Sequence, residues 1–430
     1  MPNNLQKWLA YLEQNYHYTH GGTIDSLPRL LNIAKKLNLD FFPNTVITIG
    51  GTNGKGSCVI YLESILLAAG YQVGAYISPH ILYFNERIRI NGKDIDDKKL
   101  IAAFTKIDSI CKNTATTYFE FTTLAAFYLF KNTQLDFILL EVGMGGRLDA
   151  VNIINPDISI ITTISLDHTE QLGDTKEKIG YEKAGIMRSN RPCICGDPEP
   201  PQSIIDQAKN INAHLYCFKK DFAYLKKNNK NWEFISSIKK LTNLPIPSLS
   251  LQDASTVLMT ILLLSPSFKI TEKAIKIGLI NARLLGRFQT ISKNPHVIVD
   301  VAHNPESATF LAEQLANKSI KGKTLAVVGI LKDKDIKNTL QPLLKQVDEW
   351  FVGGLYQDTA RGSKAEDLLK YLEILEIKSC YNCESVLKAY QCAIAQCSPE
   401  DRIIVFGSFY SAANILKEEK RKWKSKLNKE

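Results

Sequence analysis

The sequence lacks the features that would place it in a membrane or outside the cell. No apolar run approaches the roughly 18 residues that suggest a membrane span. The N-terminal stretch MPNNLQKWLAYLEQ has no apolar core of the signal-peptide kind. The nine cysteines form no disulfide framework. We therefore expect reduced thiols, a cytoplasmic location and no membrane partner.

The sequence also lacks a zinc pattern and a nucleic-acid motif. Its only close cysteine pairs, Cys193/Cys195 and Cys380/Cys383, lie far apart and have no matching histidines. The net charge is +9, part of it in the tail KEEKRKWKSKLNKE, residues 417–430. We interpret this tail as a solvated terminal helix or a frayed tail. The remaining excess suits anionic small substrates or nucleic acid, but no basic patch with interleaved aromatics argues for nucleic acid.

Alternating strand and helix patterns predict the fold class. Apolar runs at 46–49, 136–143 and 156–164 lie between helical or loop segments, which is the pattern of a doubly wound parallel sheet. Residues 214–247 indicate an antiparallel hairpin, and a helix follows at roughly 253–264. The α/β pattern restarts in the runs HVIVDVA, KTLAVVGI, EWFVGG and DRIIVFGS. A chain of 430 residues suits two domains, which we place at 1–290 and 291–430.

The segment VITIGGTNGKGSCVIYLESILLAAG, residues 46–70, resembles a phosphate-binding loop with a displaced hydroxyl. The usual pattern is G-x-x-x-x-G-K-[ST], with the hydroxyl residue directly after the lysine. In this chain Gly56 follows Lys55, and the hydroxyl comes one position later, at Ser57. A strand, a glycine-rich loop and a helix would present backbone amides to an anion, and Lys55 would reach the outer phosphates. Ser57 or Thr52 would ligate magnesium. The alternative is a glycine-rich turn in an unrelated α/β protein.

Further polar side chains follow predicted strands at the same sheet edge. Glu141 ends one apolar run, Asp167 and His168 follow another, and EKAGIMR supplies Lys183. Ligand sites of open α/β sheets lie at this edge. Each residue also has a structural interpretation: Glu141 as a helix cap, His168 as an ordinary loop histidine, Lys183 as a surface charge. Their coincidence beside a phosphate loop favours a site.

The chain resembles folylpolyglutamate synthases, in particular the bacterial bifunctional dihydrofolate synthase/folylpolyglutamate synthases of the Mur ligase superfamily. The matching motifs, in order, are GGTNGKGS, ISPHILYFNERIRING, LEVGMGGRLDAVN, LDHTEQLG, EKAGIMR, LLGRFQ, DVAHNP, GILKDKD, RGSKAEDL and VFGSFYSAANIL. The resemblance implies a Mur-ligase-like fold, with an ATP- and pterin-binding P-loop domain followed by a smaller Rossmann-like ligase domain. It also implies ATP-dependent addition of L-glutamate to dihydropteroate and reduced folates through an acyl phosphate.

The resemblance assigns roles to residues of the first domain. ATP would be bound by the loop residues Gly51, Thr52, Asn53, Gly54, Lys55, Gly56 and Ser57. Ser57 and Glu141 would hold a first Mg²⁺, and His168 a second with Lys183 as a carbamate. An unmodified Lys183, paired with Glu182 or with ATP, is the alternative. Asp253 stands where the family usually has an ATP-contacting asparagine, and it offers no N–H donor, so that contact is in doubt.

The remaining implied roles concern the substrates. In the second domain Asp300 would bind the nucleotide ribose and Arg287 would bind phosphate. His303 would lie near the transferred phosphoryl group and the glutamate. These residues would complete a site with the first domain. Ser78 would lie near glutamate. Asp149 would accept hydrogen bonds from the pterin, and Phe119 would stack on it or serve as a core aromatic.

The enzyme is expected to be a monomer. The alternatives are a Mur-type ligase with another acceptor and a P-loop nucleotide-binding protein without ligase chemistry.

Overall fold

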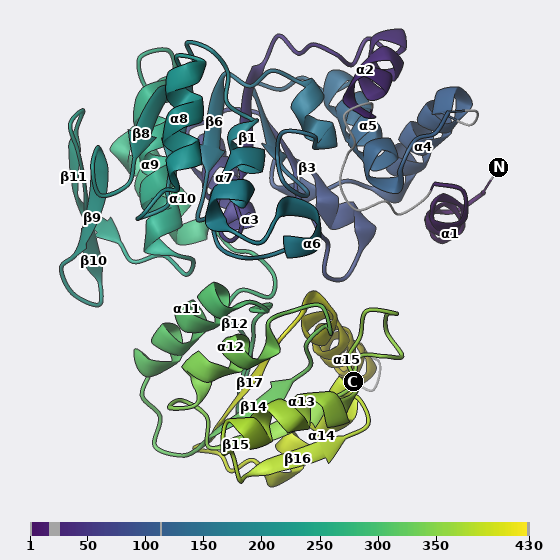
Figure 1. Ribbon diagram of the computed structural model, residues 1–430, viewed down its shortest axis with the longest axis vertical. Helices are drawn as coiled ribbons and strands as arrows, with labels where there is room; N and C mark the ends of the chain where they lie inside the picture. Colours follow the sequence, from purple (N-terminus) through teal and green to yellow (C-terminus); the bar gives the residue numbers. More distant parts are fainter. Residues whose placement is uncertain (1, 17–25, 112–113, 428–430) are drawn as a thin grey trace. The chain divides into compact units, whose positions relative to one another are not determined.

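The computed structural model describes residues 2–16, 26–111 and 114–427 (Figure 1). The chain forms two compact units, Met1–Leu284 and Leu285–Glu430. A boundary at 290/291, as expected from the sequence, would cut β12 (Gln289–Lys293), which pairs with β13 (His296–Val299) in the second unit. The division therefore lies a few residues earlier than expected.

The first unit is built on an eight-stranded sheet with strand order β4-β3-β2-β5-β1-β6-β7-β8. Its strands are β1 (Thr45–Gly50), β2 (Val73–Tyr76), β3 (Ile88–Ile90), β4 (Lys93–Asp94), β5 (Phe137–Glu141), β6 (Ile158–Ile161), β7 (Pro192–Cys195) and β8 (His214–Cys217). The sheet has six parallel strands, β2, β5, β1, β6, β7 and β8. Strands β3 and β4 extend it at one edge in antiparallel orientation. The phosphate-loop strand β1 lies between β5 and β6, so the loops after all three strands share one edge.

The helices of the first unit are α1 (Leu5–Asn15), α2 (Ser26–Lys36), α3 (Lys55–Ala68), α4 (Asp97–Cys111), α5 (Tyr118–Lys131), α6 (Thr169–Leu172), α7 (Lys176–Ala184), α8 (Gln202–Asn210), α9 (Leu251–Leu264) and α10 (Glu272–Asn281). Two 3-10 turns, η1 (Phe84–Arg87) and η2 (Ala150–Ile153), join them. Local signals define the ends of several helices. At α5, for example, Thr117 Oγ1 accepts a hydrogen bond from the Glu120 N–H, and the Glu120 carboxylate accepts one from the Thr117 N–H.

Helices cover both faces of this sheet because successive strand residues point to opposite sides. Val46 belongs to the apolar cluster that contains residues of α1, α2, α4, α5, α7 and α8, whereas Ile47 and Ile49 belong to the cluster that contains residues of α3, α9 and α10. Both faces are apolar, as expected for a parallel sheet buried between two helical layers.

The segment 214–247 differs from the expected single hairpin. Its first residues form β8 of the main sheet, and β9 (Phe222–Lys226), β10 (Asn231–Ser236) and β11 (Lys240–Pro245) form a separate antiparallel sheet. Trp232 and Phe234 of β10 are buried in the same cluster as α9, so one face of the small sheet is covered. This sheet lies at the left of the first unit in Figure 1.

The second unit contains a six-stranded sheet with strand order β12-β13-β17-β14-β15-β16. Besides β12 and β13, its strands are β14 (Thr324–Val328), β15 (Glu349–Gly353), β16 (Cys380–Cys383) and β17 (Arg402–Phe406). Only β12 runs antiparallel to its neighbour. The helices are α11 (Pro305–Ala316), α12 (Ile336–Leu340), η3 (Gln341–Leu343), α13 (Ala365–Ile374), α14 (Val386–Gln396) and α15 (Phe409–Leu427).

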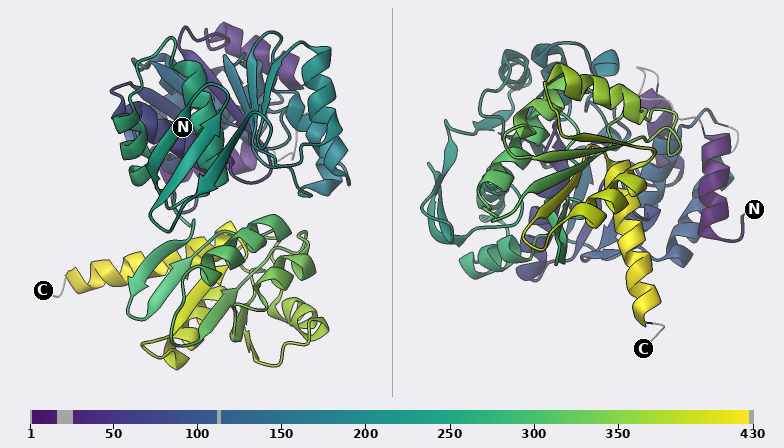
Figure 2. Two further views of the ribbon diagram at one scale, coloured as in Figure 1. Left: turned by 90° about the vertical axis from the view of Figure 1, so that its left-hand side faces the viewer. Right: turned by 90° about the horizontal axis from the view of Figure 1, so that it is seen from below.

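One apolar cluster forms the core of the second unit beneath α11, α12 and α13. Helix α14 packs on β14, β15 and β16, and α15 packs on β17 and α14. Figure 2 shows α15 projecting beyond its sheet. Of the two interpretations of the basic tail, the helical one holds up to Leu427; residues 428–430 lie outside the described residues. No helix of the described chain is long and apolar enough to cross a membrane.

Candidate active site

The loop between β1 and α3 has the backbone of an anion-binding loop. Gly51 and Gly54 have φ angles of 135° and 90°, where side chains are strained. A Cβ on Gly51 would lie 1.7 Å from Thr162 Oγ1, so this position also requires glycine for space. The Thr52 N–H donates to the Thr163 carbonyl at 2.7 Å, which fixes the loop to the segment after β6. The loop therefore opens α3 with its N-terminal amides at the sheet edge.

Two lysines converge on the carbonyl of Gly51. Lys55 Nζ donates to the carbonyl oxygens of Gly51 and Thr52 at 3.0 Å each, and Lys183 Nζ donates to that of Gly51 at 2.8 Å. Lys183 is only 4% exposed, so its interpretation as a surface charge is wrong. The Glu182 carboxylate is engaged by Arg147 at 2.7 Å. Two ammonium groups beside a glycine loop produce a positive region suited to a polyanion.

Glu141 lies against the start of α3. A Cβ on Gly56 would be 3.8 and 3.9 Å from the two carboxylate oxygens of Glu141, and the Ser78 N–H donates to Glu141 Oε2 at 2.9 Å. Ser57, the next residue of α3, is buried in the same first turn. The interpretation of Glu141 as a helix cap is thus replaced by a carboxylate held beside the phosphate loop. Glu141 therefore lies beside the first turn of α3, which contains Ser57, and accepts a hydrogen bond from Ser78.

The segment after β6 carries His168 at the same edge. Ser165 N–H donates to Thr52 Oγ1 at 3.1 Å, and Thr52 Oγ1 donates to the Ser165 carbonyl at 3.2 Å. His168 has φ 51°, in the left-handed region, and its Nε2 lies 4.0 Å from Asp167 Oδ2. Its side chain is 37% exposed. Such a histidine is accessible to a ligand.

Asp197, which the sequence reasoning did not single out, supports this segment. It follows β7 and is buried, with Oδ2 accepting from the Ile164 N–H at 2.6 Å and Oδ1 from the Glu199 N–H at 2.8 Å. The sequence carries a signal for Asp197, because this residue also follows a strand of the parallel sheet. It was missed because the cysteines of β7 were considered only as metal ligands.

The donor chemistry fits a hard divalent ion. Ser57 and Glu141 offer oxygen, which Mg²⁺ prefers, and this ion keeps several waters and phosphate oxygens as ligands. Within the described chain no group of three or more His, Cys, Asp or Glu is arranged to hold a metal.

Asp149 is held by backbone amides. Oδ1 accepts from the Val151 N–H at 3.0 Å, capping η2, and Oδ2 accepts from the Met144 N–H at 2.9 Å. Burial raises the pKa of the Asp149 carboxyl to about 6, although the amides counteract it. Asp149 is thus a capping residue as well as a candidate substrate-binding residue.

Phe119 lies beside the loop that leads to Asp149. A Cβ on Gly143 would be 2.5 Å from Phe119 Cζ, so the ring covers this glycine. The Phe119 ring is 6.0 Å from that of Tyr76 and is only partly buried. The ring packs against the apolar core of the first unit and is partly exposed, so its stacking on a flat ligand stays a prediction.

Asp253 faces the phosphate loop from α9. A Cβ on Gly54 would lie 2.4 Å from Asp253 Oδ1 and 3.0 Å from Oδ2, so the carboxylate rests directly on this glycine. Asp253 is 7% exposed. The chain therefore places a carboxylate next to the loop residue Gly54, where the family pattern has an uncharged amide.

In the second unit Asp300, Arg287 and His303 gather around the end of β13. Asp300 accepts from the Phe288 and Ala302 N–H groups at 2.7 Å each; burial raises its pKa and Arg287 opposes the rise. His303 Nδ1 is 2.8 Å from the Val301 carbonyl oxygen, which makes Nδ1 the donor. Arg287 lies 5.6 Å from the ring centroid of Phe409.

Comparison with known proteins identifies the family. The Mur ligase middle domain matches residues 49–245, and the Mur ligase, glutamate ligase domain matches residues 286–409. The dihydrofolate synthase/folylpolyglutamate synthase of Escherichia coli (strain K12) is 41% identical over 413 residues, covering 96% of this chain and 94% of the relative. The chain belongs to the dihydrofolate synthase/folylpolyglutamate synthase family.

Solved structures of this family share the fold. E. coli FolC in complex with DHPP and ADP has a TM-score of 0.92 at 39% identity, covering 98% of this chain and 100% of that chain. A bifunctional folylpolyglutamate synthase/dihydrofolate synthase with Mn, AMPPNP and L-glutamate bound has a TM-score of 0.89 at 40% identity, with 97% and 98% covered. The family resemblance and the Mur-ligase-like α/β fold predicted from the sequence are confirmed.

Proposed function

We infer that the chain is an ATP-dependent acid–amino-acid ligase that adds L-glutamate to dihydropteroate and to reduced folates. The observation that carries this inference is the phosphate loop with Lys55, Lys183 and Glu141 converging on it. The family supports it, since one relative binds DHPP and ADP, and another binds Mn, AMPPNP and L-glutamate.

Binding of ATP would use the loop amides and Lys55. The N–H groups at the start of α3 face the sheet edge, where they stabilise negative charge. The Lys55 ammonium now bonds two loop carbonyls, and a triphosphate is a stronger acceptor for it. All residues of the loop, 51–57, are proposed to contact ATP.

A divalent metal would be held by Ser57 and Glu141, with His168 and a carbamylated Lys183 serving a second Mg²⁺. When bound, Mg²⁺ offsets the repulsion between the triphosphate and the acceptor carboxylate. The Ser78 N–H holds the Glu141 carboxylate in place by donating to Oε2. For Lys183, carbamylation would exchange a cation for an oxygen ligand at a buried position.

The reaction joins a carboxylate to an amine at the expense of one ATP. The acceptor carboxylate attacks the γ-phosphorus, the bond to ADP breaks, and an acyl phosphate forms. The amine of L-glutamate attacks the acyl carbon, releases phosphate and loses a proton, leaving the amide. The first unit would hold the acceptor through Phe119 and Asp149. We also predict that Asp300 binds the ribose and that Arg287 binds phosphate. His303 and Ser78 are predicted to lie in the region where glutamate binds.

One assay tests the proposal. Phosphate release from ATP is measured with dihydropteroate and then with tetrahydrofolate, each with and without L-glutamate. We expect release that depends on both acceptor and glutamate, and Lys55→Ala should abolish it while leaving the circular dichroism spectrum unchanged. Glutamate-independent turnover would indicate a nucleotide hydrolase. Activity confined to other carboxylates would indicate a Mur-type ligase with a different acceptor.

A further inference from the structure

Asp197 is a buried aspartate whose carboxylate holds main-chain groups of two loops. It lies two residues after the end of β7 and is 3% exposed. Its Oδ2 accepts from the Ile164 N–H at 2.6 Å, and its Oδ1 accepts from the Glu199 N–H at 2.8 Å. Because burying a carboxylate costs free energy, we expect the contact to matter for the segment that Asp197 holds.

The Ile164 N–H lies beyond the end of β6, where the sheet no longer provides its acceptor. Strand β6 ends at Ile161, whose carbonyl accepts from the Gly196 N–H at 2.7 Å. Pro198 then follows Asp197 and has no N–H with which to continue the ladder. Ile164 is 1% exposed, and its bond to Asp197 is buried. The Asp197 carboxylate therefore takes the place of a strand partner for a buried N–H.

The opposite side of the same segment is hydrogen-bonded to the phosphate loop. The Thr52 N–H donates to the Thr163 carbonyl at 2.7 Å, and the Ser165 N–H donates to Thr52 Oγ1 at 3.1 Å. Ile164 lies between these two residues and directs its N–H to Asp197 instead. This alternation is that of an extended chain, in which successive residues present their main-chain groups to opposite sides. Thr52 and Asp197 thus hold the segment 163–165 from its two sides.

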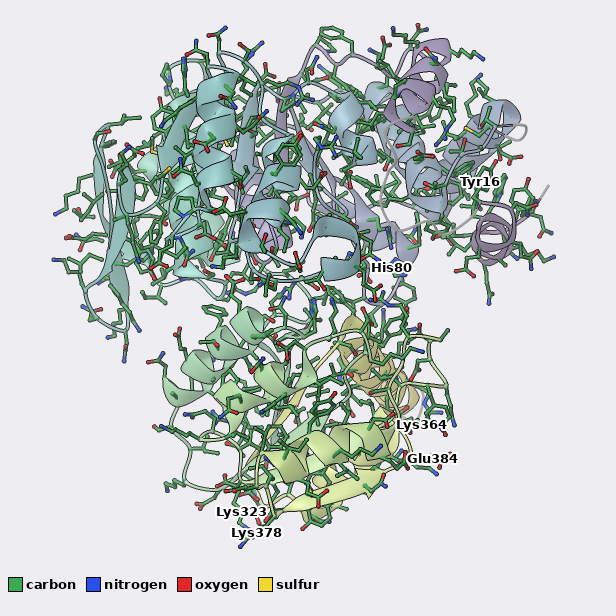
Figure 3. The ribbon with its side chains drawn as sticks, viewed as in Figure 1. Tyr16, His80, Lys323, Lys364, Lys378 and Glu384 are labelled. Atoms are coloured by element: carbon green, nitrogen blue, oxygen red, sulfur yellow. The ribbon has the colours of Figure 1, made fainter. Side chains whose placement is uncertain are left out.

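The segment leads directly into the turn that carries His168. His168 lies four residues after Ile164, has φ 51°, and its carbonyl accepts from N–H groups of α6. The His168 N–H donates to Asp167 Oδ1 at 2.9 Å. This turn lies at the edge of the first sheet that also carries the loop after β2, on which Figure 3 labels His80. Because the turn is short and internally hydrogen-bonded, a displacement of Ile164 would move His168.

We propose that Asp197 is a positioning residue that sets the place of His168 for metal binding. This inference rests on the proposed function, in which His168 serves the second Mg²⁺. Loss of the carboxylate would leave the bonds to Thr52 in place and release the side of the segment that faces β7. The displacement would therefore affect His168 and not the phosphate loop. Removal of groups that orient a metal ligand lowers metal affinity or activity by about 10–100-fold.

The test measures Mn²⁺ binding to the full chain in the presence of AMPPNP by electron paramagnetic resonance, which needs neither acceptor nor glutamate. His168→Ala identifies the ion that depends on this histidine. Asp197→Ala should raise the dissociation constant of the same ion by about tenfold or more. The double variant should bind it no more weakly than His168→Ala alone, because both changes act on one interaction. Asp197→Asn, which keeps one acceptor oxygen, should show a smaller increase than Asp197→Ala.

Asp157→Ala is the matched control. Asp157 precedes β6 at the opposite edge of the sheet, and its Oδ2 accepts from the Val46 N–H at 2.9 Å. It makes the same kind of bond to a neighbouring main chain, away from His168. This variant should leave the Mn²⁺ affinity unchanged. Thermal unfolding establishes that each variant is folded, and Asp197→Asn provides the comparison if Asp197→Ala does not fold.

Three results would overturn the proposal. They are an unchanged Mn²⁺ affinity in the folded Asp197 variants, additive losses in the double variant, and an equal loss of AMPPNP affinity measured without metal. If the wild type bound AMPPNP but no Mn²⁺ ion that depends on His168, the metal assignment of the proposed function would fail, and this inference with it. Absence of glutamate-dependent phosphate release, with the expected Mn²⁺ results, would overturn the proposed ligase activity alone.

Discussion

At the scale of single residues, Lys183 combines a structural and a chemical role. Its ammonium holds the Gly51 carbonyl from a buried position. An ammonium is unable to ligate a metal, whereas a carbamate on the same nitrogen offers an anionic oxygen. The ammonium and the carbamate forms of Lys183 therefore predict different effects on activity when the side chain is removed.

We expect Lys183→Ala to lower turnover by about 100-fold or more, as loss of a metal-supporting group does. Formate or acetate should restore part of the activity by replacing the missing oxygen ligand, and the Mg²⁺ dependence should steepen. Lys178→Ala is the control, because Lys178 is an exposed lysine of the same helix, paired with Asp174. Near-normal activity of Lys183→Ala would contradict the carbamate. Inactivity without rescue would leave only the hydrogen bond to Gly51.

Asp149 predicts a pH dependence of stability. Its carboxyl pKa is about 6 in the folded chain against an ordinary value of 3.8. Between these values the folded state binds the proton more tightly, so unfolding releases it. The free energy of unfolding should therefore fall as the pH rises from about 4 to about 6, by up to about 3 kcal/mol. Urea denaturation across this range should show the slope in the wild type and a smaller one in Asp149→Asn. Parallel curves would contradict the pKa assignment.

Residue types at strand ends could be predicted from the sequence, but their partners could not. The rule that parallel strands end at one edge located Ser57, Glu141 and His168. It gave no indication that Lys183 would reach the Gly51 carbonyl, because this contact joins segments distant in the chain.

At the scale of elements, the start of α3 depends on Gly54. Gly54 and Gly70 flank this helix with φ angles of 90° and 94°. A Cβ at Gly70 would meet nothing within 4 Å, whereas one at Gly54 would meet the Asp253 carboxylate at 2.4 Å. The two glycines thus share backbone strain and differ in the space around them.

We expect Gly70→Ala to destabilise the fold by about 1–2 kcal/mol through strain alone, with unchanged ADP affinity. Gly54→Ala should add displacement of Asp253 and weaken ADP binding by about tenfold or more, because the loop amides would move. Urea denaturation and ADP titration measure the two effects separately. Equal ADP affinities for the two variants would show that the Gly54–Asp253 contact does not support the loop.

Strands within long apolar runs could be predicted, and those outside such runs could not. The runs that became β1, β5, β6, β13, β14, β15 and β17 are apolar and follow or precede helical patterns. The strands β2, β7, β8 and β16 are no shorter than β6 and β13, with four residues each, but they do not stand out as apolar runs, and four residues are too few for periodicity to distinguish them from loops. The misassigned hairpin has the same cause. The residues of β8 join the main sheet through pairing with β7, which no local pattern encodes.

At the scale of the whole molecule, the apolar cores follow the two units. The clusters on the two faces of the first sheet contain residues up to Ala282, and that of the second unit begins at Phe288. A unit with its own core and a complete sheet has what independent folding requires. The segment 285–430 should therefore fold alone, and its exact start should matter.

The fragments 285–430 and 291–430 test this boundary directly. The shorter fragment loses Phe288, which is 8% exposed and belongs to the core, and burial of such a side chain contributes about 1.5–3 kcal/mol. It also loses the Phe288 N–H that donates to Asp300 and the pairing of Gln289 and Thr290 with β13. We expect cooperative thermal unfolding of 285–430 and a clearly lower midpoint, or no cooperative transition, for 291–430. Equal midpoints would contradict a division at 284/285. Failure of both fragments to fold would mean that the second unit requires the first.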